Sequence, residues 1–317
     1  MSIRNRDIFV AGHRGLVGSA LVKILRERGY SNIITAPRSE LDLCSFNAVK
    51  SFFKAQKPYG VILAAAKVGG IMANNELRAD FIYENLQIQN NLIQQAHINN
   101  VQKLIFLGSS CIYPREAPQP IKESSLMTAP LEFTNRPYAI AKIAGMELID
   151  SLRRQHKRAY FSVMPTNLYG PGDNYHPNHS HVLPGLIRRF CEAKKANKPE
   201  VLVWGSGKPL REFMHSSDAA RAIIDLYEKL PDNYFEGNWS HINIGSGQEV
   251  SICELAEIIA NALDYKGKIN FDKTKPDGTM RKLLCSNRIQ SLGINPQVSL
   301  KDGISQAIDE FNIKYLG

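Results

Sequence analysis

Short apolar runs recur through the first half of the chain, and segments of helical periodicity separate them. Apolar runs of this kind, bounded by turn-forming residues, are typical of buried strands. Alternation with helices favours strands that lie parallel in one sheet, because a parallel pair needs a long crossover connection. The predicted strands are residues 7–11, 32–36, 61–66, 103–107 and 159–164.

The segments between these strands carry apolar residues at the three- and four-residue spacing of a helix face. The best defined are residues 16–28, residues 137–154, and residues 80–99, which we expect to be amphipathic. Strands that alternate with helices predict an α/β fold, a Rossmann-type doubly wound parallel sheet with helices on both faces. Such a sheet binds ligands at the carboxyl ends of its strands.

The character of the sequence changes after Gly170. Residues 173–181 are polar, and helices are expected at 182–195 and 218–230, the second of which would return to the main sheet. Short helices and strands are expected beyond residue 251. We therefore predict a first domain of residues 1–172 with a later return near 212–245, and a smaller C-terminal domain of residues 173–211 and 246–317.

Composition narrows the class of protein. Hydrophobic residues make up 44% of the 317 residues and charged residues 22%, which is ordinary for a globular protein. No apolar run approaches the roughly 18 to 20 residues of a membrane-spanning helix, and residues 1–7 lack the apolar core of a signal peptide. We therefore expect a cytoplasmic protein that does not contact a membrane. The five cysteines are widely spaced and contain no CxxC pair, which argues against a disulfide framework or structural zinc.

The formal net charge of +9 suits two classes of protein. Nucleic-acid binders are often basic, and enzymes that act on phosphate-bearing small molecules also need arginine and lysine. The basic residues are scattered, with no run of five or more. Charge alone does not decide between these classes.

A glycine-rich turn, GHRGLVG at residues 12–18, follows the first strand and opens the first helix. Glycines permit a tight turn, and the N–H groups of the helix N-terminus can then hold a phosphate. The context predicts dinucleotide binding, with a plain turn as the alternative. The predicted contacts are Gly12, His13, Arg14, Gly15, Leu16, Val17 and Gly18.

The end of the second predicted strand indicates which dinucleotide is bound. An acidic residue at this place usually holds the ribose 2′-hydroxyl of NAD, but the sequence there is APRS, at residues 36–39. Arg38, together with Arg14 of the turn, suits a 2′-phosphate. We therefore predict NADP rather than NAD. The alternative is that either arginine is a solvated surface group.

A set of polar residues indicates hydride transfer at a carbonyl carbon. Tyr138 and Lys142 form a YxxxK motif, and their spacing places both side chains on one helix face. A nearby ammonium, together with the positive charge of an oxidised nicotinamide, is expected to lower the pKa of the tyrosine toward that of a usable acid or base. Ser109 ends the fourth strand, where it can hydrogen-bond the carbonyl. Cys111 follows two residues later, where nearby positive charge would favour its thiolate; a packed cysteine is the alternative.

Motifs spread over residues 12–282 resemble those of the extended short-chain dehydrogenase/reductases, and in particular the GDP-L-fucose synthase family. The matching stretches are GHRGLVGSA, LAAAKVGGI, LGSSCIYP, PYAIAKIAG, SVMPTNLYGPGDN and KPDGT-RK. The resemblance implies a two-step reaction on GDP-4-keto-6-deoxy-D-mannose. Epimerisation at C3 and C5 comes first, and NADPH-dependent reduction of the C4 ketone then produces GDP-L-fucose.

The resemblance also assigns residues. Cys111 and His181 become the base and acid of epimerisation, while Tyr138, Ser109 and Lys142 assist reduction. His179 is a rival to His181, but the family histidine stands directly before a valine. Further cofactor contacts would be Leu107, Gly108, Ser109, Ser110, Lys142, Pro165, Thr166, Asn167, Leu168 and His181. Contacts to the GDP-sugar would be Arg189, Trp204, Arg211, Asp277 and Lys282.

Other possibilities stay open at this stage. His176, His179 and His181 have a spacing that suits a metal, but no acidic or cysteine ligand accompanies them, so we predict no metal. A related 4,6-dehydratase or 4-epimerase would hold NAD tightly and would not need Cys111. A non-catalytic NADPH sensor would not need the serine, tyrosine and lysine. The family is usually dimeric through a four-helix bundle, for which residues 80–99 and 137–154 are the candidates; no nucleic-acid partner is expected.

Overall fold

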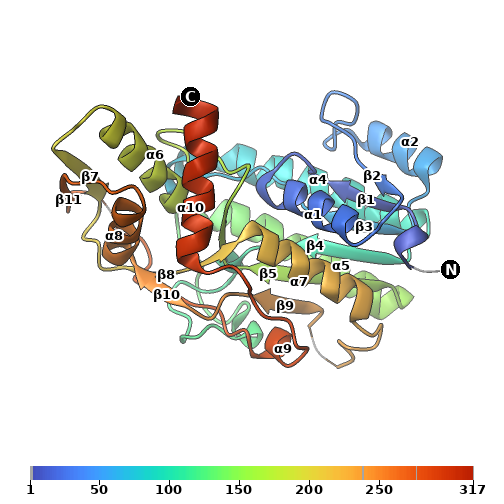
Figure 1. The fold of residues 1–317 in the computed structure, drawn as a ribbon. Helices are drawn as coiled ribbons and strands as arrows, with labels where there is room; N and C mark the ends of the chain where they lie inside the picture. Colours follow the sequence, from blue (N-terminus) through green and yellow to red (C-terminus); the bar gives the residue numbers. More distant parts are fainter. Residues whose placement is uncertain (1–2, 238, 276, 317) are drawn as a thin grey trace.

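The computed structural model describes residues 3–237, 239–275 and 277–316, so Pro276 of the KPDGT stretch lies outside the described residues. Six parallel strands form the main sheet in the order β2-β1-β3-β4-β5-β9 (Figure 1). β2 and β3 therefore lie on opposite sides of β1. The carboxyl end of β1 is the switch point where such sheets bind ligands. The strands are β1 (Ile8–Ala11), β2 (Ile33–Ile34), β3 (Gly60–Leu63), β4 (Lys103–Leu107), β5 (Ala159–Pro165) and β9 (His241–Ile244).

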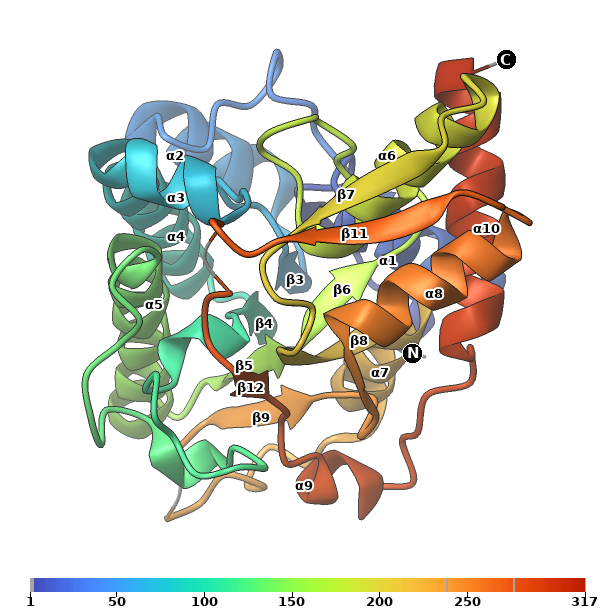
Figure 2. The same ribbon diagram turned by 90° about the vertical axis from the view of Figure 1, so that its left-hand side faces the viewer.

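Helices cover both faces of this sheet, which confirms the predicted doubly wound α/β fold (Figures 1 and 2). One face carries α1 (Leu16–Glu27) and α7 (Ser216–Lys229), which pack on each other and share a buried apolar cluster. The opposite face carries α2 (Phe46–Gln56), α4 (Arg78–Ile98) and α5 (Arg136–His156), with a cluster of their own. A sheet buried on both faces explains why its strands are apolar runs rather than alternating patterns.

Helix α4 corrects the predicted amphipathic pattern. Its buried face includes the amide side chains of Asn85, Gln89, Asn91 and Gln95 beside its apolar residues. Buried amides are tolerated only when they are hydrogen-bonded. Asn85 donates to the carbonyl oxygen of Phe81 at 2.7 Å, and Gln89 and Asn91 donate to carbonyl oxygens outside the helix. Backbone carbonyl oxygens accept the hydrogen bonds of these buried amides. The buried face of α4 therefore need not be a continuous apolar stripe.

Two predicted strands are longer than the observed ones. β2 contains only two residues, and β3 ends at Leu63 instead of residue 66. Residues 64–66 leave the sheet and line a cleft at its carboxyl edge. Periodicity did not detect this because alanines suit a strand interior and a cleft wall equally well.

The C-terminal part packs around a third apolar cluster, and its helices α8 and α10 are longer than the short helices that we expected. A small mixed sheet, with β6 and β12 parallel and β10 antiparallel to β8, joins this part to the main sheet. Helices here are α6 (Val182–Lys195), as predicted, α8 (Ile252–Ala262), α9 (Asn287–Gln290) and α10 (Leu300–Phe311). Strands are β6 (Asn167–Tyr169), β7 (Glu200–Trp204), β8 (Leu210–His215), β10 (Glu249–Ser251), β11 (Lys268–Asp272) and β12 (Arg281–Lys282).

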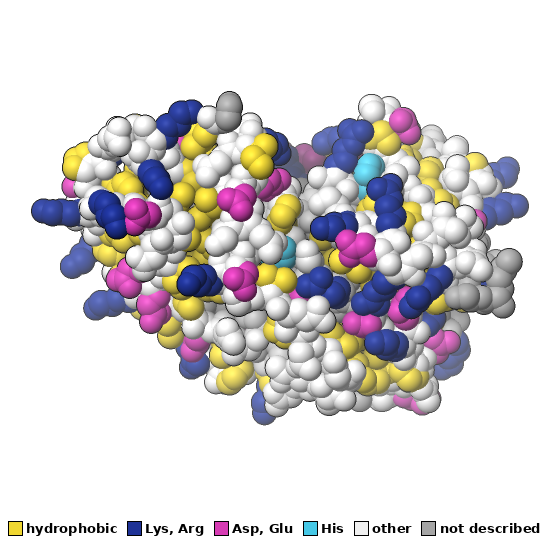
Figure 3. Space-filling model, viewed as in Figure 1, with side chains coloured by type: hydrophobic (Ala, Val, Ile, Leu, Met, Phe, Trp, Pro, Cys, Tyr) yellow, Lys and Arg dark blue, Asp and Glu magenta, His cyan; other side chains and the backbone are white. Residues whose placement is uncertain are grey.

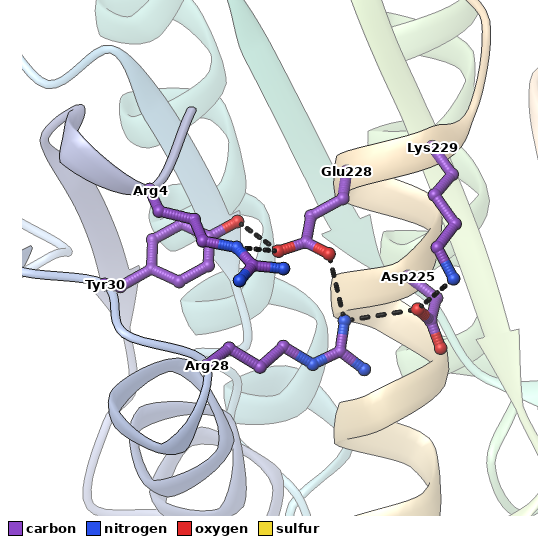
Figure 4. A network of polar contacts seen from close by, with 6 residues as sticks. All are labelled: Arg4, Arg28, Tyr30, Asp225, Glu228 and Lys229. Atoms are coloured by element: carbon purple, nitrogen blue, oxygen red, sulfur yellow. Dashed lines mark hydrogen bonds and ion pairs between the residues drawn. The ribbon is translucent and has the colours of Figure 1, made fainter. Parts of the chain in front are cut away.

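A polar network ties the N-terminal segment to α7 (Figure 4). Glu228 accepts hydrogen bonds from Arg4 and Tyr30, each at 3.2 Å, and from Arg28 at 3.1 Å. Arg28 also donates to Asp225 at 3.1 Å. These contacts hold the C-terminal end of α1 on α7 and so help to fix the helix whose other end faces the cleft.

A buried histidine in β9 predicts how stability depends on pH. His241 is 1% exposed, and burial lowers its pKa to about 4. The unfolded chain binds a proton below about pH 6.5, whereas the folded chain stays neutral to about pH 4. Stability is therefore lost as the pH falls through this window, by about 3 kcal/mol in total.

Replacing His241 with glutamine is expected to flatten this part of the pH dependence. Urea unfolding at pH 7 and pH 4.5 measures the difference in free energy of unfolding for each protein. The exposed His156, replaced in the same way, is the control. An H241Q variant that loses as much stability as the wild type between these pH values would contradict the assignment.

Candidate active site

A single cleft of about 1460 Å³ lies at the carboxyl edge of the main sheet and extends to the C-terminal part. Every residue that the sequence analysis assigned to cofactor, substrate or catalysis contributes to its lining. Helix α3 (Ile71–Glu76) and the polar loop before α6 form further parts of the wall. Segments far apart in the sequence therefore face the same space.

The glycine turn closes tightly between β1 and α1. Gly12 has a φ of 86°, and a Cβ on Gly18 would lie 2.0 Å from the Gly12 carbonyl oxygen. Gly15 caps α1 without a side chain, so the first N–H groups of the helix have no side-chain cap in the turn. Free N–H groups and the positive end of the helix dipole suit an anionic phosphate. The turn has the shape and the donors that a dinucleotide pyrophosphate requires.

Arg14 and Arg38 are exposed at the same end of the cleft, next to this turn. Within the described ranges, neither guanidinium makes an ion pair with a carboxylate. His13 lies beside them, and burial together with the Arg14 charge lowers the pKa of its imidazole. Two uncompensated guanidinium groups beside a neutral histidine favour a ligand that carries extra negative charge.

Four side chains from the turn after β4 and from α5 meet at the centre of the cleft. Ser109 accepts a hydrogen bond from the Cys111 backbone N–H at 3.4 Å. Lys142 donates to the Leu107 carbonyl oxygen at 2.8 Å, and its ammonium lies 5.7 Å from the centre of the Tyr138 ring. This arrangement places a phenolic hydroxyl group, a thiol and an ammonium around one small volume.

The electrostatics at this centre differ from our expectation for tyrosine and cysteine. Burial raises the pKa of Tyr138, and the charge of Cys111 acts in the same direction. Burial also raises the pKa of the Cys111 thiol, although the Lys282 ammonium opposes it most strongly. The pKa of Lys142 falls to about 8 because its ammonium is buried. The protein groups alone therefore favour the neutral tyrosine and thiol, since removal from water outweighs the neighbouring positive charge.

The loop that carries His181 is held against helix α3. The Gly70 N–H donates to the His179 carbonyl oxygen at 3.0 Å, and a Cβ on Gly70 would lie 2.5 Å from the Ser180 carbonyl oxygen. Only glycine leaves room for this close approach. The side chain of the neighbouring Asn74 donates to the Gly69 and Gly70 carbonyl oxygens and so supports the turn. The two-glycine turn therefore sets the position of the loop.

Three histidines of this loop have different surroundings. His176 and His179 stack with ring centroids 4.6 Å apart, and His179 approaches Glu76 at 3.8 Å. His181 does not take part in this stack. Removal of its imidazole from water, together with the Lys282 charge, lowers its pKa. Among the described residues, no group of three or more His, Cys, Asp or Glu side chains is arranged to hold a metal ion.

The half of the cleft that includes Arg189, Trp204 and Arg211 is rich in cations. The Arg189 guanidinium lies 4.3 Å from the centre of the Trp204 ring, which is 41% exposed. Arg211 donates to the Asp277 carbonyl oxygen at 3.3 Å. The Asp277 carboxylate accepts two hydrogen bonds from Ser206, which lower its pKa. Asp277 therefore orders the loop around Gly205, while the arginines and Trp204 present charge and an aromatic face to the cleft.

Other residues in the cleft wall were not predicted from the sequence. Lys275 lies 5.6 Å from the centre of the Trp204 ring, and Lys67 reaches Asp80 and Glu84 of α4. Only the KPDGT stretch gave a sequence signal near Lys275. The missed lining side chains with polar groups include Lys67, Arg115, Glu132, Asn135, Asn174 and Lys275.

Comparison with known proteins identifies the family. The NAD dependent epimerase/dehydratase family matches residues 8–245. GDP-L-fucose synthase 1 of Arabidopsis thaliana is 56% identical over 309 residues, 98% of this chain and 94% of that protein. GDP-L-fucose synthase of Escherichia coli (strain K12) is 52% identical over 307 residues, 96% of each chain.

A solved structure supports the same placement. A GDP-D-glycero-L-gluco-heptose synthase from Campylobacter jejuni, solved in the presence of NADPH, is 35% identical with a TM-score of 0.92. The match covers 98% of this chain and 100% of that one. In the part of the chain that is described, no helix is long and apolar enough to cross a membrane. The chain therefore belongs to the NAD dependent epimerase/dehydratase family, a family of NAD(P)-binding enzymes, and within it to the GDP-L-fucose synthases.

Proposed function

We propose that the protein converts GDP-4-keto-6-deoxy-D-mannose to GDP-L-fucose, by epimerisation at C3 and C5 followed by reduction at C4. One observation carries the proposal: Cys111 and His181 line the same cleft as Ser109, Tyr138 and Lys142. A simple ketone reductase needs only the last three. The further acid and base give the cleft the groups that inversion of two carbons requires.

Epimerisation begins with the acidity that the C4 ketone confers on its neighbouring C–H bonds. Cys111 takes the proton from C3 or C5, and the electron pair passes to the ketone oxygen to give an enolate. His181 then supplies a proton to the opposite face of the carbon. Tyr138 and Ser109 donate hydrogen bonds to the enolate oxygen, which stabilises the charge as it develops.

Reduction uses the other three side chains. NADPH, when bound, supplies a hydride to C4. Tyr138 gives its phenolic proton to the C4 oxygen, and Ser109 holds this oxygen in place. Lys142 keeps its ammonium near the phenol ring, where it stabilises the phenolate that remains. The ammonium is anchored by the Leu107 carbonyl oxygen, so it acts from a fixed position.

The two halves of the cleft suit different parts of the ligands. We propose that residues 1–172, with a return near 212–245, hold NADP, and that residues 173–211 and 246–317 hold the GDP-sugar. The diphosphate of the sugar nucleotide would pair with Arg189 and Arg211. Figure 3 shows Lys and Arg side chains interspersed with Asp and Glu on the face in view, which favours small anionic ligands over a nucleic acid.

The choice of NADPH over NADH is the basis of a further prediction. Replacing Arg38 with alanine removes charge-assisted contacts to the 2′-phosphate worth roughly 1.5 to 3 kcal/mol, so KM for NADPH should rise about 10- to 100-fold. KM for NADH should stay within about twofold, since NADH has no 2′-phosphate. Initial rates at varied cofactor concentration measure both constants.

Arg26 provides a matched control for this prediction. It is an exposed arginine of α1 that does not line the cleft, so Arg26→Ala should leave both constants unchanged. Equal effects of Arg38→Ala on NADPH and NADH would show that Arg38 does not contact the 2′-phosphate.

One assay tests the proposed reaction as a whole. The protein is incubated with GDP-4-keto-6-deoxy-D-mannose and NADPH, and absorbance and product are followed. We expect one NADPH oxidised for each GDP-L-fucose formed. Absence of NADPH oxidation would exclude the proposal, and turnover with a tightly held NAD would favour a 4,6-dehydratase or a 4-epimerase. A non-catalytic sensor would bind NADPH without any product.

We also propose a homodimer in which α4 and α5 of two copies form a four-helix bundle. Both helices expose large apolar side chains, including Tyr83 at 64% and Ile140 at 43%. Apolar groups gathered on neighbouring helices suit a partner surface. Light scattering in solution that returned the mass of one chain would exclude the dimer. The cytoplasmic location stays a prediction.

A further inference from the structure

An ammonium without a partner among the described residues lies in the cleft that also holds the two proposed epimerisation residues. Lys282 is half-buried and lines the cleft, and among the residues described it has neither a hydrogen-bond acceptor nor an ion-paired carboxylate. Its neighbours differ in this respect. Lys142 donates to a carbonyl oxygen, and Arg211 donates to the carbonyl oxygens of Leu210 and Asp277. An uncompensated charge in a shielded site is costly and therefore indicates a function.

The backbone of Lys282 is held on two sides. On one side β12 pairs with β8, with Lys282 opposite Arg211, and the carboxylate of the buried Glu212 accepts a hydrogen bond from the Leu284 N–H at 3.1 Å. Side chains at paired positions of adjacent strands point to the same face of a sheet. Lys282 therefore lies on the same, cleft-facing side of the small sheet as Arg211. Backbone contacts fix its position, so no contact of its ammonium is needed for this.

On the other side, the strand is tied to the chain that follows Cys111. Gln119 donates to the Arg281 carbonyl oxygen at 3.2 Å and accepts from the Leu283 N–H at 2.9 Å. The Ile121 N–H donates to the Leu283 carbonyl oxygen at 2.8 Å. Lys282 thus lies between two anchored neighbours, and the loop that fixes them continues directly from the segment that carries Cys111.

The charge of Lys282 acts on both epimerisation residues. It is the strongest influence that opposes the rise in the pKa of the Cys111 thiol, and it contributes to the lowered pKa of His181. Reciprocally, Cys111 is the main charge that favours the protonated form of Lys282, against the burial that lowers its pKa. A cation at this place stabilises the thiolate, so a larger fraction of Cys111 is ionised and able to accept a proton, and it makes the imidazolium a stronger acid.

We propose that Lys282 acts as the fixed counter-charge of the Cys111 thiolate during epimerisation, in addition to any contact with the substrate diphosphate. This proposal rests on the proposed function. In the step, the C–H proton moves to the Cys111 sulfur, the electron pair passes to the ketone oxygen, and His181 returns a proton to the opposite face of the carbon. One proton is thus transferred from His181 to Cys111 through the substrate. Lys282 stays protonated and acts through Cys111, so it is a positioning residue.

Alkylation of Cys111 tests this role without any substrate. Wild type and Lys282→Met are treated with iodoacetamide at a series of pH values, and peptide mass spectrometry measures the rate at Cys111. Loss of a nearby ammonium should move the midpoint of the rate profile up by about one pH unit, so the rate near pH 7 should fall about tenfold. Lys282→Arg should restore most of the rate, because it restores the charge.

Lys273→Met is the matched control, since Lys273 is exposed and does not line the cleft. An alkylation profile of Lys282→Met identical to that of the wild type, with only a higher KM for the sugar nucleotide, would overturn the proposal and assign Lys282 to the diphosphate alone. Lys282→Gln replaces the methionine variant if that protein fails to bind NADPH. A wild type that forms no GDP-L-fucose would refute the proposed function and would leave the alkylation result to be judged separately.

Discussion

Replacing Tyr138 with phenylalanine is expected to lower kcat for ketone reduction by about 10²- to 10⁴-fold, the range for loss of a positioned general acid. Phenylalanine keeps the ring that packs edge-on against Phe81, with centroids 6.3 Å apart, so the local packing should persist. Only the proton donor is lost. Oxidation of NADPH in the presence of GDP-4-keto-6-deoxy-D-mannose measures the rate, and fluorescence titration measures the affinity for NADPH.

The affinity for NADPH should stay within a few-fold in this variant. Tyr315→Phe is the control, because Tyr315 is an exposed tyrosine near the C-terminus that does not line the cleft. Exchange of substrate hydrogens with D2O should continue in Tyr138→Phe at a lower rate, because Cys111 and His181 are unchanged but one hydrogen bond to the enolate oxygen is lost. A variant that still reduces the ketone at more than about a tenth of the wild-type rate would show that another group supplies the proton.

The second large effect is expected for Cys111→Ser. A serine hydroxyl ionises at a far higher pH than a thiol, so it cannot serve as the base, and deuterium uptake at C3 and C5 should fall about 10²- to 10⁴-fold. NADPH binding should be unchanged because the thiol is not part of the glycine turn. NMR or mass spectrometry of the sugar nucleotide in D2O measures the uptake, and Cys285→Ser, outside the cleft lining, is the control.

The pH dependence of this exchange has a defined sign. Burial raises the pKa of the Cys111 thiol above its ordinary value, so only a minor fraction is ionised near pH 7. Wild-type exchange should therefore increase with pH by up to about tenfold per unit until the thiol is ionised. Unchanged deuterium uptake in Cys111→Ser, or an exchange rate that falls with pH, would remove Cys111 from the mechanism.

At the centre of the cleft, the spacing of residues along the chain was sufficient to predict which side chains are neighbours but not how their pKa values shift. The four-residue interval between Tyr138 and Lys142 does bring the ammonium near the phenol ring, because helix geometry is local. The predicted lowering of the tyrosine pKa was wrong for the protein groups alone. Spacing shows which groups are neighbours, but the degree of burial depends on packing by distant elements such as α4, and burial dominates here.

The long helix before β4 makes the same point for the fold. Its existence followed from sequence, and α4 spans nearly the predicted range. Its amphipathic character could not be predicted from the sequence. Gln89 and Asn91 are buried and donate to carbonyl oxygens of α5 and of the segment before α2. A pattern counts such amides as polar and therefore exposed, whereas the tertiary structure gives them acceptors.

The sequence by itself determined the order of strands and helices, the glycine turn at the end of β1, and the identity of the serine, tyrosine and lysine that meet in the cleft. Each of these depends on residues close together along the chain, where periodicity, turn geometry and motif spacing act. The tertiary structure alone decided that Lys282 lines the same cleft as Cys111 without a partner among the described residues, that Gly70 holds the His181 loop, and that His241 is buried. These features join segments distant in sequence, and only the packing of the sheet against the C-terminal part brings them together.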